Sequence, residues 1–363
     1  MDRPVRAQGT SEAVLWLALL SSATLKRQTA KRLLYRWCIE EGRSAAALLG
    51  ARGEELAQHY GLSAAEAAQV SAARAHIKAQ EARLAQWRKQ GIGLLTRADV
   101  AYPEGWLERI LEERLPYLVF YRGDLALLAQ PGIAILGGAN PGAQAQAAAQ
   151  AVARWLATTE YILVSGHHPG IERAALEAAR SAGGSAALIL PAGLEHYPDL
   201  ASVAGAQELV LSPYLPETPP SEALAQARWP LVMALAEALV LVAPDLAPGA
   251  WPAVDAFLAG GRPVLLWTGM DEGQTSAWRE AGALLCATPE AVEQALAEAL
   301  LANGAWPAQT GTKEGTASAP DETLGETIPL DDAEAAIAAL SKTGRVPEAL
   351  ARRLRQLQAK GDR

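Results

Sequence analysis

A Rossmann-like α/β fold with a doubly wound, mostly parallel sheet is predicted by three stretches of the sequence. Apolar runs of strand length lie at 132–138, 161–164 and 186–190, and segments of helical length separate them. Runs that are apolar at every position, and not only at alternate ones, indicate strands that are buried on both faces. When such strands alternate with helices they build a parallel sheet, and its ligand crevice lies at the carboxyl ends of the strands.

Glycine-rich turns follow the first two runs. The first run ends in Gly137 and Gly138, and the second is followed by the loop 165–170, Ser-Gly-His-His-Pro-Gly. Glycine lets the backbone approach a ligand, and the next helix points free N–H groups at it, so the pattern favours capture of an anion such as phosphate. The spacing lacks the G-x-G-x-x-G step of dinucleotide-binding folds. The same glycines are also consistent with tight turns that bind no ligand.

Further runs extend the sheet in both directions. Runs at 208–211, 239–243, 263–267 and 282–286 predict four more strands, and runs at 91–96 and 116–124 predict two strands that pack across the sheet edge. We therefore expect a Rossmann-like domain at 91–302. Residues 303–327 are rich in Gly, Thr, Ala, Glu and Pro without periodicity and are expected to form a linker, followed by a short helical segment at 328–363.

A small all-helical domain is expected at 1–90. Glycines punctuate its short helices, as in helix-hairpin-helix and sterile-alpha-motif-like modules, and Ser63 with Glu66 forms a capping-box pattern. One helix carries a cationic face composed of Lys26, Arg27, Lys31, Arg32 and Arg36. This face can contact phosphates, although a run of charges more often forms a solvated helix surface.

The charge is divided unevenly along the chain. Residues 1–100 have 15 Lys+Arg and 9 Asp+Glu, a net +6, whereas residues 101–300 have 9 and 22, a net −13. The N-terminal part can therefore attract a nucleic-acid backbone that the sheet domain repels. Two cysteines without partner spacing, together with the absence of a secretory signal or a membrane-length apolar run, favour a cytoplasmic protein that does not enter a membrane. His167 and His168 lack a third ligand at suitable spacing, so no metal site is expected.

Several short motifs, in unbroken order from about residue 12 to 287, resemble the DprA/Smf family of DNA-processing proteins. They are Gly91-Ile92, Tyr102-Pro103, Tyr121-Arg122-Gly123, the 133–138 strand with its glycines, Val164-Ser165-Gly166, Gly170-Ile171-Glu172, Gly193-Leu194-Glu195, Tyr197-Pro198, Gly261-Arg262-Pro263-Val264 and Glu280-Ala281-Gly282-Ala283. The resemblance implies an extended Rossmann fold after a helical domain. It also implies homodimerisation, binding of single-stranded DNA and delivery of that DNA to a RecA-type recombinase in natural transformation or recombination. No chemical step and no cofactor are implied.

The phosphate-binding arginines of the family pattern are partly missing. Ala139 stands where the first glycine turn of the family has arginine, Pro169 stands where an arginine is common, and only Arg228 remains of an Arg-Asn-Arg motif. A later Ser-Gly-Ser turn has become 248–250, Pro-Gly-Ala. Each missing arginine removes a bidentate phosphate partner, so we expect weaker DNA binding than the family pattern implies.

The residues that remain define a candidate nucleic-acid or phosphate site. It consists of Gly137, Gly138, Ser165, Gly166, His167, His168, Gly170 and Arg228. The two histidines can bind an anion when protonated, hydrogen-bond a base, or remain solvated. Two alternative functions stay open: a nucleotide-binding or phosphoribohydrolase-like protein on the same fold, and a degenerate paralogue that acts only through protein partners.

Overall fold

The computed structural model of the chain describes residues 11–200, 207–245, 251–267 and 272–302. The chain divides into two compact units, Met1–Pro307 and Ala308–Arg363, and the second lies outside the described residues. The expected linker at 303–327, the C-terminal helical segment at 328–363 and the 248–250 turn therefore cannot be compared with the structure. The domain boundary at residue 90 also stays a prediction.

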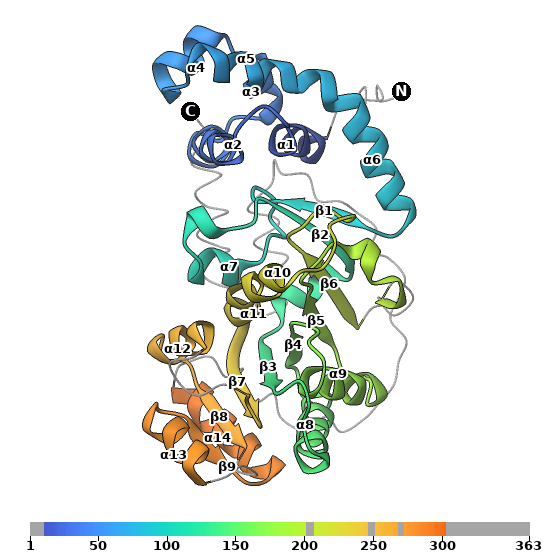
Figure 1. Cartoon of the computed structure of the whole chain (residues 1–363), viewed down its shortest axis with the longest axis vertical. Helices are drawn as coiled ribbons and strands as arrows, with labels where there is room; N and C mark the ends of the chain where they lie inside the picture. Colours follow the sequence, from blue (N-terminus) through green and yellow to red (C-terminus); the bar gives the residue numbers. More distant parts are fainter. Residues whose placement is uncertain (1–10, 201–206, 246–250, 268–271, 303–363) are drawn as a thin grey trace, which may run out of the picture. The chain divides into compact units, whose positions relative to one another are not determined.

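The N-terminal part of the described chain is helical, as expected (Figure 1). Its elements are α1 (Glu12–Leu20), α2 (Arg27–Leu34), the π-helix η1 (Tyr35–Glu40), α3 (Ala45–Gly50), α4 (Gly53–Tyr60), α5 (Ala64–Ala72), the 3₁₀-helix η2 (Ala73–His76) and α6 (Ile77–Lys89). The capping box is confirmed, because the Ser63 side chain accepts from the Glu66 N–H and the Glu66 carboxylate accepts from the Ser63 N–H. η2 separates α5 from α6, so the capping box begins a helical segment that is not one continuous α-helix.

After α6, the described part of this unit contains a nine-stranded mixed sheet. Its strands are β1 (Gly93–Thr96), β2 (Leu118–Gly123), β3 (Gly132–Gly137), β4 (Ile162–Ser165), β5 (Ala186–Ile189), β6 (Glu208–Ser212), β7 (Ala236–Val242), β8 (Val264–Trp267) and β9 (Leu284–Cys286). They follow the order β1-β2-β6-β5-β4-β3-β7-β8-β9. The pairs β1–β2 and β2–β6 are antiparallel and all others are parallel. The Rossmann-like prediction is confirmed, including the two early strands at the sheet edge.

Helices connect the strands and pack on the sheet. They are α7 (Glu104–Arg109), η3 (Glu112–Arg114), η4 (Leu125–Ala129), α8 (Ala143–Leu156), α9 (Ile171–Ser181), η5 (Leu194–His196), η6 (Pro198–Leu200), α10 (Glu222–Ala227), α11 (Trp229–Leu235), α12 (Pro252–Ala259), α13 (Glu272–Glu280) and α14 (Pro289–Ala302). α8 packs against α9 and α14, whereas α11 packs against α7 and α12. Among the described helices, none is both long enough and apolar enough to cross a bilayer.

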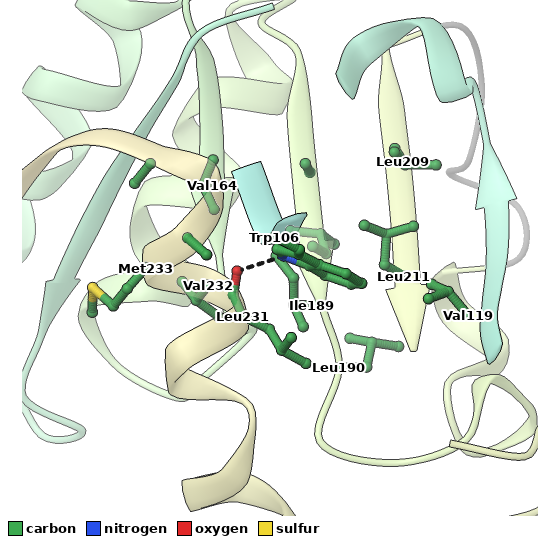
Figure 2. Packing of buried hydrophobic residues seen from close by; sticks show 14 of the residues in the cluster. Trp106, Val119, Val164, Ile189, Leu190, Leu209, Leu211, Leu231, Val232 and Met233 are labelled. Carbon is green, nitrogen blue, oxygen red and sulfur yellow. Dashed lines mark hydrogen bonds between the residues drawn. The ribbon is translucent and has the colours of Figure 1, made fainter. Parts of the chain in front are cut away.

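The core of the sheet is apolar throughout, which explains the continuous runs in the sequence. Ile133 to Leu136 of β3 are fully buried, as are Leu239 to Val242 of β7. Trp106 of α7 closes one side of this core, where its indole N–H donates to the Leu231 carbonyl over 2.9 Å (Figure 2). Because the bond satisfies a buried donor, the large ring can be buried without a lost hydrogen bond.

Candidate nucleic-acid interface

The direction of winding reverses at β3. From β3 the chain proceeds through β4 and β5 to β6, then returns to β7 on the other side of β3 and continues to β8 and β9. Ligands of open α/β sheets bind in the crevice outside the carboxyl ends of the strands at such a switch point. The loops that leave β3, β4 and β7 meet here, and they contain most of the predicted site residues.

The first glycine turn is closed by the protein's own groups. A Cβ at Gly137 would overlap the Val242 carbonyl, and one at Gly138 would overlap the carboxylate of Asp245. That carboxylate accepts a hydrogen bond from the Ala139 N–H over 2.9 Å. The turn therefore offers its N–H to an aspartate, at the place where the sequence predicted a phosphate.

The second loop surrounds a buried carboxylate. Glu172 is 1% exposed, and its Oε2 accepts from the Ser165 hydroxyl at 3.1 Å, the Gly166 N–H at 2.7 Å and the His168 N–H at 3.3 Å. The fully buried Ser165 hydroxyl in turn accepts from the His167 N–H at 3.0 Å. The N–H groups that were expected to hold a phosphate are thus bonded within the loop.

Gly170 joins the two turns. Its φ of +83° lies in the left-handed region, and an added Cβ would overlap the carbonyls of Gly138 and Ala139. The next residue, Ile171, donates its N–H to the Gly138 carbonyl over 3.2 Å. Glycine is required here for backbone conformation and close packing between the two turns.

Arg228 lies under the loop and not on its surface. Its side chain is 1% exposed, Nε donates to the Gly166 carbonyl over 2.9 Å, and Nη1 donates to the Ala225 carbonyl. Its guanidinium also stacks 4.3 Å from the centroid of the Trp229 ring. These contacts position the loop from below, and Nη2 has no hydrogen-bond partner within the described part of the chain. That Arg228 contacts a phosphate stays an untested prediction, and its burial does not favour it.

Among the residues that the structure describes, three buried polar atoms of this cluster have no hydrogen-bond partner. They are His167 Nδ1, Glu172 Oε1 and Arg228 Nη2. An unpaired polar atom away from water costs free energy, so each atom needs a bound water or a ligand group. Together they form a set of one donor, one acceptor, and one imidazole nitrogen that can play either role.

Aromatic rings surround the same loop. The His167 ring meets the Tyr197 ring edge-on at 5.7 Å, and the His168 ring lies 6.4 Å from that of Trp229, which packs edge-on against Trp251 at 5.2 Å. His167, His168 and Tyr197 are half-buried, so part of each ring remains accessible. Half-exposed rings of this kind can stack with nucleic-acid bases.

The protonation states oppose a cationic role for His167. Burial, with help from Arg173, Arg180 and Arg228, lowers the pKa of His167 to about 4, so its ring is neutral at physiological pH. His167 also has a positive φ of 57°, which is uncommon outside glycine. Burial raises the pKa of Glu172, against the pull of Arg228. A neutral His167 fits hydrogen bonding to a base better than pairing with a phosphate.

The structure thus brings all eight predicted site residues together at the switch point of the sheet, although their binding role is not tested by it. Sequence reasoning missed Asp245 and Trp251, because nothing in their local patterns marks them and they reach the site only through the fold. No group of three or more His, Cys, Asp or Glu suited to a metal occurs among the described residues.

Comparison with known proteins agrees with this architecture. The family model for DNA recombination-mediator protein A matches residues 93–296. The chain is 28% identical to DNA processing protein DprA of Bacillus subtilis over 165 residues, which cover 44% of this chain and 54% of that protein. It is 30% identical to DNA processing protein DprA of Streptococcus pneumoniae over 154 residues, 41% of this chain and 54% of that protein. The chain thus matches about half the length of these relatives.

A solved structure extends the likeness in fold. The X-ray structure of DprA from Streptococcus pneumoniae superposes with a TM-score of 0.59 over 77% of this chain and 97% of that one, at 21% sequence identity. At this identity the superposition concerns the fold, while the family model rests on sequence. Because that model covers more than half of the chain, including the strands and loops of the crevice, the chain belongs to the DNA recombination-mediator protein A family.

Proposed function

We propose that this chain binds single-stranded DNA and that its crevice contacts the bases more than the phosphates. The observation that carries the proposal is the cluster of unpaired buried atoms on His167, Glu172 and Arg228, beside half-exposed aromatic rings. Base edges supply donors and acceptors that would satisfy this set, and bases stack on such rings regardless of sequence. The Asp245 and Glu172 carboxylates already occupy the nearby N–H groups, which disfavours a phosphate there.

Family membership supports the wider setting of the proposal. We infer that the bound strand is passed to a RecA-type recombinase during recombination or natural transformation, that the chain acts as a homodimer, and that it works in the cytoplasm. The inferred role is binding and delivery of DNA without a chemical step.

Oligothymidine and an abasic strand of the same length provide the test. Anisotropy titrations with both strands, at low and moderate salt, separate base contacts from backbone contacts because the abasic strand keeps every phosphate. We expect the oligothymidine to bind at least tenfold more tightly, since one base stacked on an aromatic ring contributes about 1–3 kcal/mol. His167→Asn, which tolerates the positive φ, should reduce this difference.

Equal affinity for the two strands would overturn base recognition. Saturable binding of a mononucleotide that competes fully with the oligonucleotide would instead indicate the nucleotide-binding alternative. RecA delivery is tested separately, by the rate at which a RecA-type recombinase assembles on single-stranded DNA coated with a single-strand-binding protein. No acceleration by this chain would contradict that part of the proposal.

A second function is favoured by one specific observation. Both glycine turns are bonded to carboxylates of the chain itself, which fits a paralogue that keeps the fold and acts only through protein partners. Absence of binding to either strand by the correctly folded protein, at low salt as well as moderate salt, would support this alternative.

A further inference from the structure

A second hollow, separate from the crevice, lies beside α2. It is a cavity of about 620 Å³, and we name it the α2 pocket. Its walls come from α2, the segment 110–117, the Pro213–Tyr214 turn and the junction of α10 with α11. This volume is within the range of pockets that hold small molecules and cofactors, roughly 300–1,000 Å³.

The walls of the α2 pocket are cationic. Arg27, Lys31 and Arg114 line it, and no carboxylate residue does. Lys31 is fixed in place, since its Nζ donates to the carbonyls of Glu113 at 2.9 Å and Leu115 at 2.7 Å. Arg27 and Arg114 are exposed, and neither forms an ion pair with a described carboxylate within 4.0 Å. Arg27 repels Lys31, whereas Glu112 and Glu113 attract Lys31 from outside the lining. An anion between the three cations would relieve the repulsion that remains at the lining.

The start of α2 gives an independent indication of an anion. Arg27 is the first residue of the helix, Lys26 precedes it, no side chain caps the N-terminus, and the first turn contains no acidic residue. Cations at a helix N-terminus interact unfavourably with the helix dipole, and the first N–H groups of the helix have no intrahelical partner. A bound phosphate would accept from these N–H groups and compensate the arginine charge.

The remaining wall is aromatic and apolar. Tyr117 is buried and Tyr214 half-buried, and Leu231 and three prolines lie on this side as well. The Lys31 ammonium lies 4.6 Å from the centroid of the Tyr117 ring. An occupant that matches both sides has a negatively charged group and a flat, weakly polar body, and a nucleotide has this combination.

The α2 pocket adjoins the crevice through one short segment. Ala227, Pro230 and Leu231 line the pocket, whereas the intervening Arg228 and Trp229 lie under the crevice loop. Burial raises the pKa of Tyr214, and both Arg228 and Arg27 oppose that rise, which places this ring within the electrostatic reach of both sites.

We propose that the α2 pocket is a second nucleotide-binding site, which holds a phosphate-bearing nucleotide of the same single strand whose other bases occupy the crevice. The inference rests on the proposed function for the identity of the strand. In this arrangement Arg27 and Arg114 of the α2 pocket contact the phosphates, and these are contacts that the crevice lacks.

The test uses the full chain, oligothymidines of two lengths and the double variant Arg27→Gln/Arg114→Gln. A strand of roughly 4 nucleotides fills one site, and one of roughly 16 nucleotides can occupy both. For the double variant we expect affinity for the long strand to fall at least tenfold. The slope of log K against log salt should become shallower by about 1.4, as for the loss of two phosphate contacts on a single strand. Affinity for the short strand should stay within about twofold, since the crevice contacts are intact.

Lys78→Gln is the control, because it removes one charge from the N-terminal helical part at an exposed position outside both the pocket lining and the cationic face of α2. It should leave both strands bound as in the parent chain. A circular dichroism melt confirms that the double variant folds. The parent chain and the double variant are also titrated with deoxythymidine 5′-monophosphate. This comparison distinguishes a free nucleotide from a nucleotide within a strand as the occupant of the pocket.

The failures can be told apart. If the parent chain binds neither strand, the proposed function is wrong and the α2 pocket proposal fails with it. If the parent binds both strands and the double variant binds them equally well, only the α2 pocket proposal is overturned. The double variant can also be titrated with a fluorescently labelled acidic peptide. If it loses binding to this peptide while its affinity for the oligonucleotide is unchanged, the proposal is overturned as well, because the pocket would then serve a protein partner.

Discussion

Replacement of Glu172 tests whether this buried carboxylate holds the crevice loop together. Three donors converge on one of its oxygens, the Ser165 hydroxyl and the N–H groups of Gly166 and His168. Because all three bonds end on Oε2, Glu172→Gln can keep them with its single amide oxygen. Glu172→Leu has a similar size but removes every acceptor and leaves buried N–H groups unpaired.

The contacts set the expected magnitudes. A hydrogen bond to a charged group contributes about 1.5–3 kcal/mol, and a buried donor left without a partner costs about 1–3 kcal/mol. The bond from His168 is long at 3.3 Å and adds little. We therefore expect Glu172→Leu to lower the free energy of unfolding by about 3–5 kcal/mol, whereas Glu172→Gln should lower it by about 1–2 kcal/mol, the part due to charge.

Urea denaturation at pH 7, followed by tryptophan fluorescence, measures both variants. Trp229 and Trp251 lie beside the loop, so local loosening would also alter the emission of the folded state. A loss below about 1 kcal/mol for Glu172→Leu, or equal losses for the two variants, would refute the view that Glu172 fixes the loop through its hydrogen bonds.

Three further outcomes follow from single contacts. The pKa of His167 falls from 6.5 to about 4 on folding, so between these pH values the unfolded chain binds more protons than the folded chain. The free energy of unfolding therefore declines as the pH drops through this window. His167→Asn should remove up to about 2 kcal/mol of the stability difference between pH 7 and pH 5, measured by urea denaturation at both pH values. Gly170→Ala should lower the free energy of unfolding by more than about 2 kcal/mol, because the residue has a positive φ and its Cβ would overlap the Gly138 carbonyl. Gly261→Ala should lower it by about 1 kcal/mol, because Gly261 has a φ of +71° but open space around it. Equal shifts in melting temperature for the two variants would contradict this. Trp106→Phe removes the indole N–H bond to the Leu231 carbonyl, which keeps its place in α11, and should cost about 0.5–1.5 kcal/mol by urea denaturation; an unchanged stability would show that the bond contributes nothing.

The sheet was predictable from sequence because its strands are buried on both faces. A residue between two helical layers must be apolar whichever side it faces, so runs such as Ile133 to Leu136 identify strands without any alignment. The capping box at Ser63 was equally local, since both of its partners lie within one helical turn. Strand ends were less determined: the run that predicted β7 begins at residue 239, whereas the strand itself begins at Ala236, directly after α11 ends at Leu235.

What each glycine turn holds was decided only by the tertiary structure. The sequence alone placed Gly137, Gly138 and the 165–170 loop at one crevice, because the carboxyl ends of parallel strands share one edge of a sheet. It did not show that the carboxylate of Asp245, more than 100 positions away, accepts a hydrogen bond from the first turn, or that Arg228 lies buried beneath the second. Periodicity and spacing record which face of an element is apolar, whereas partners brought together from distant segments depend on how those elements pack.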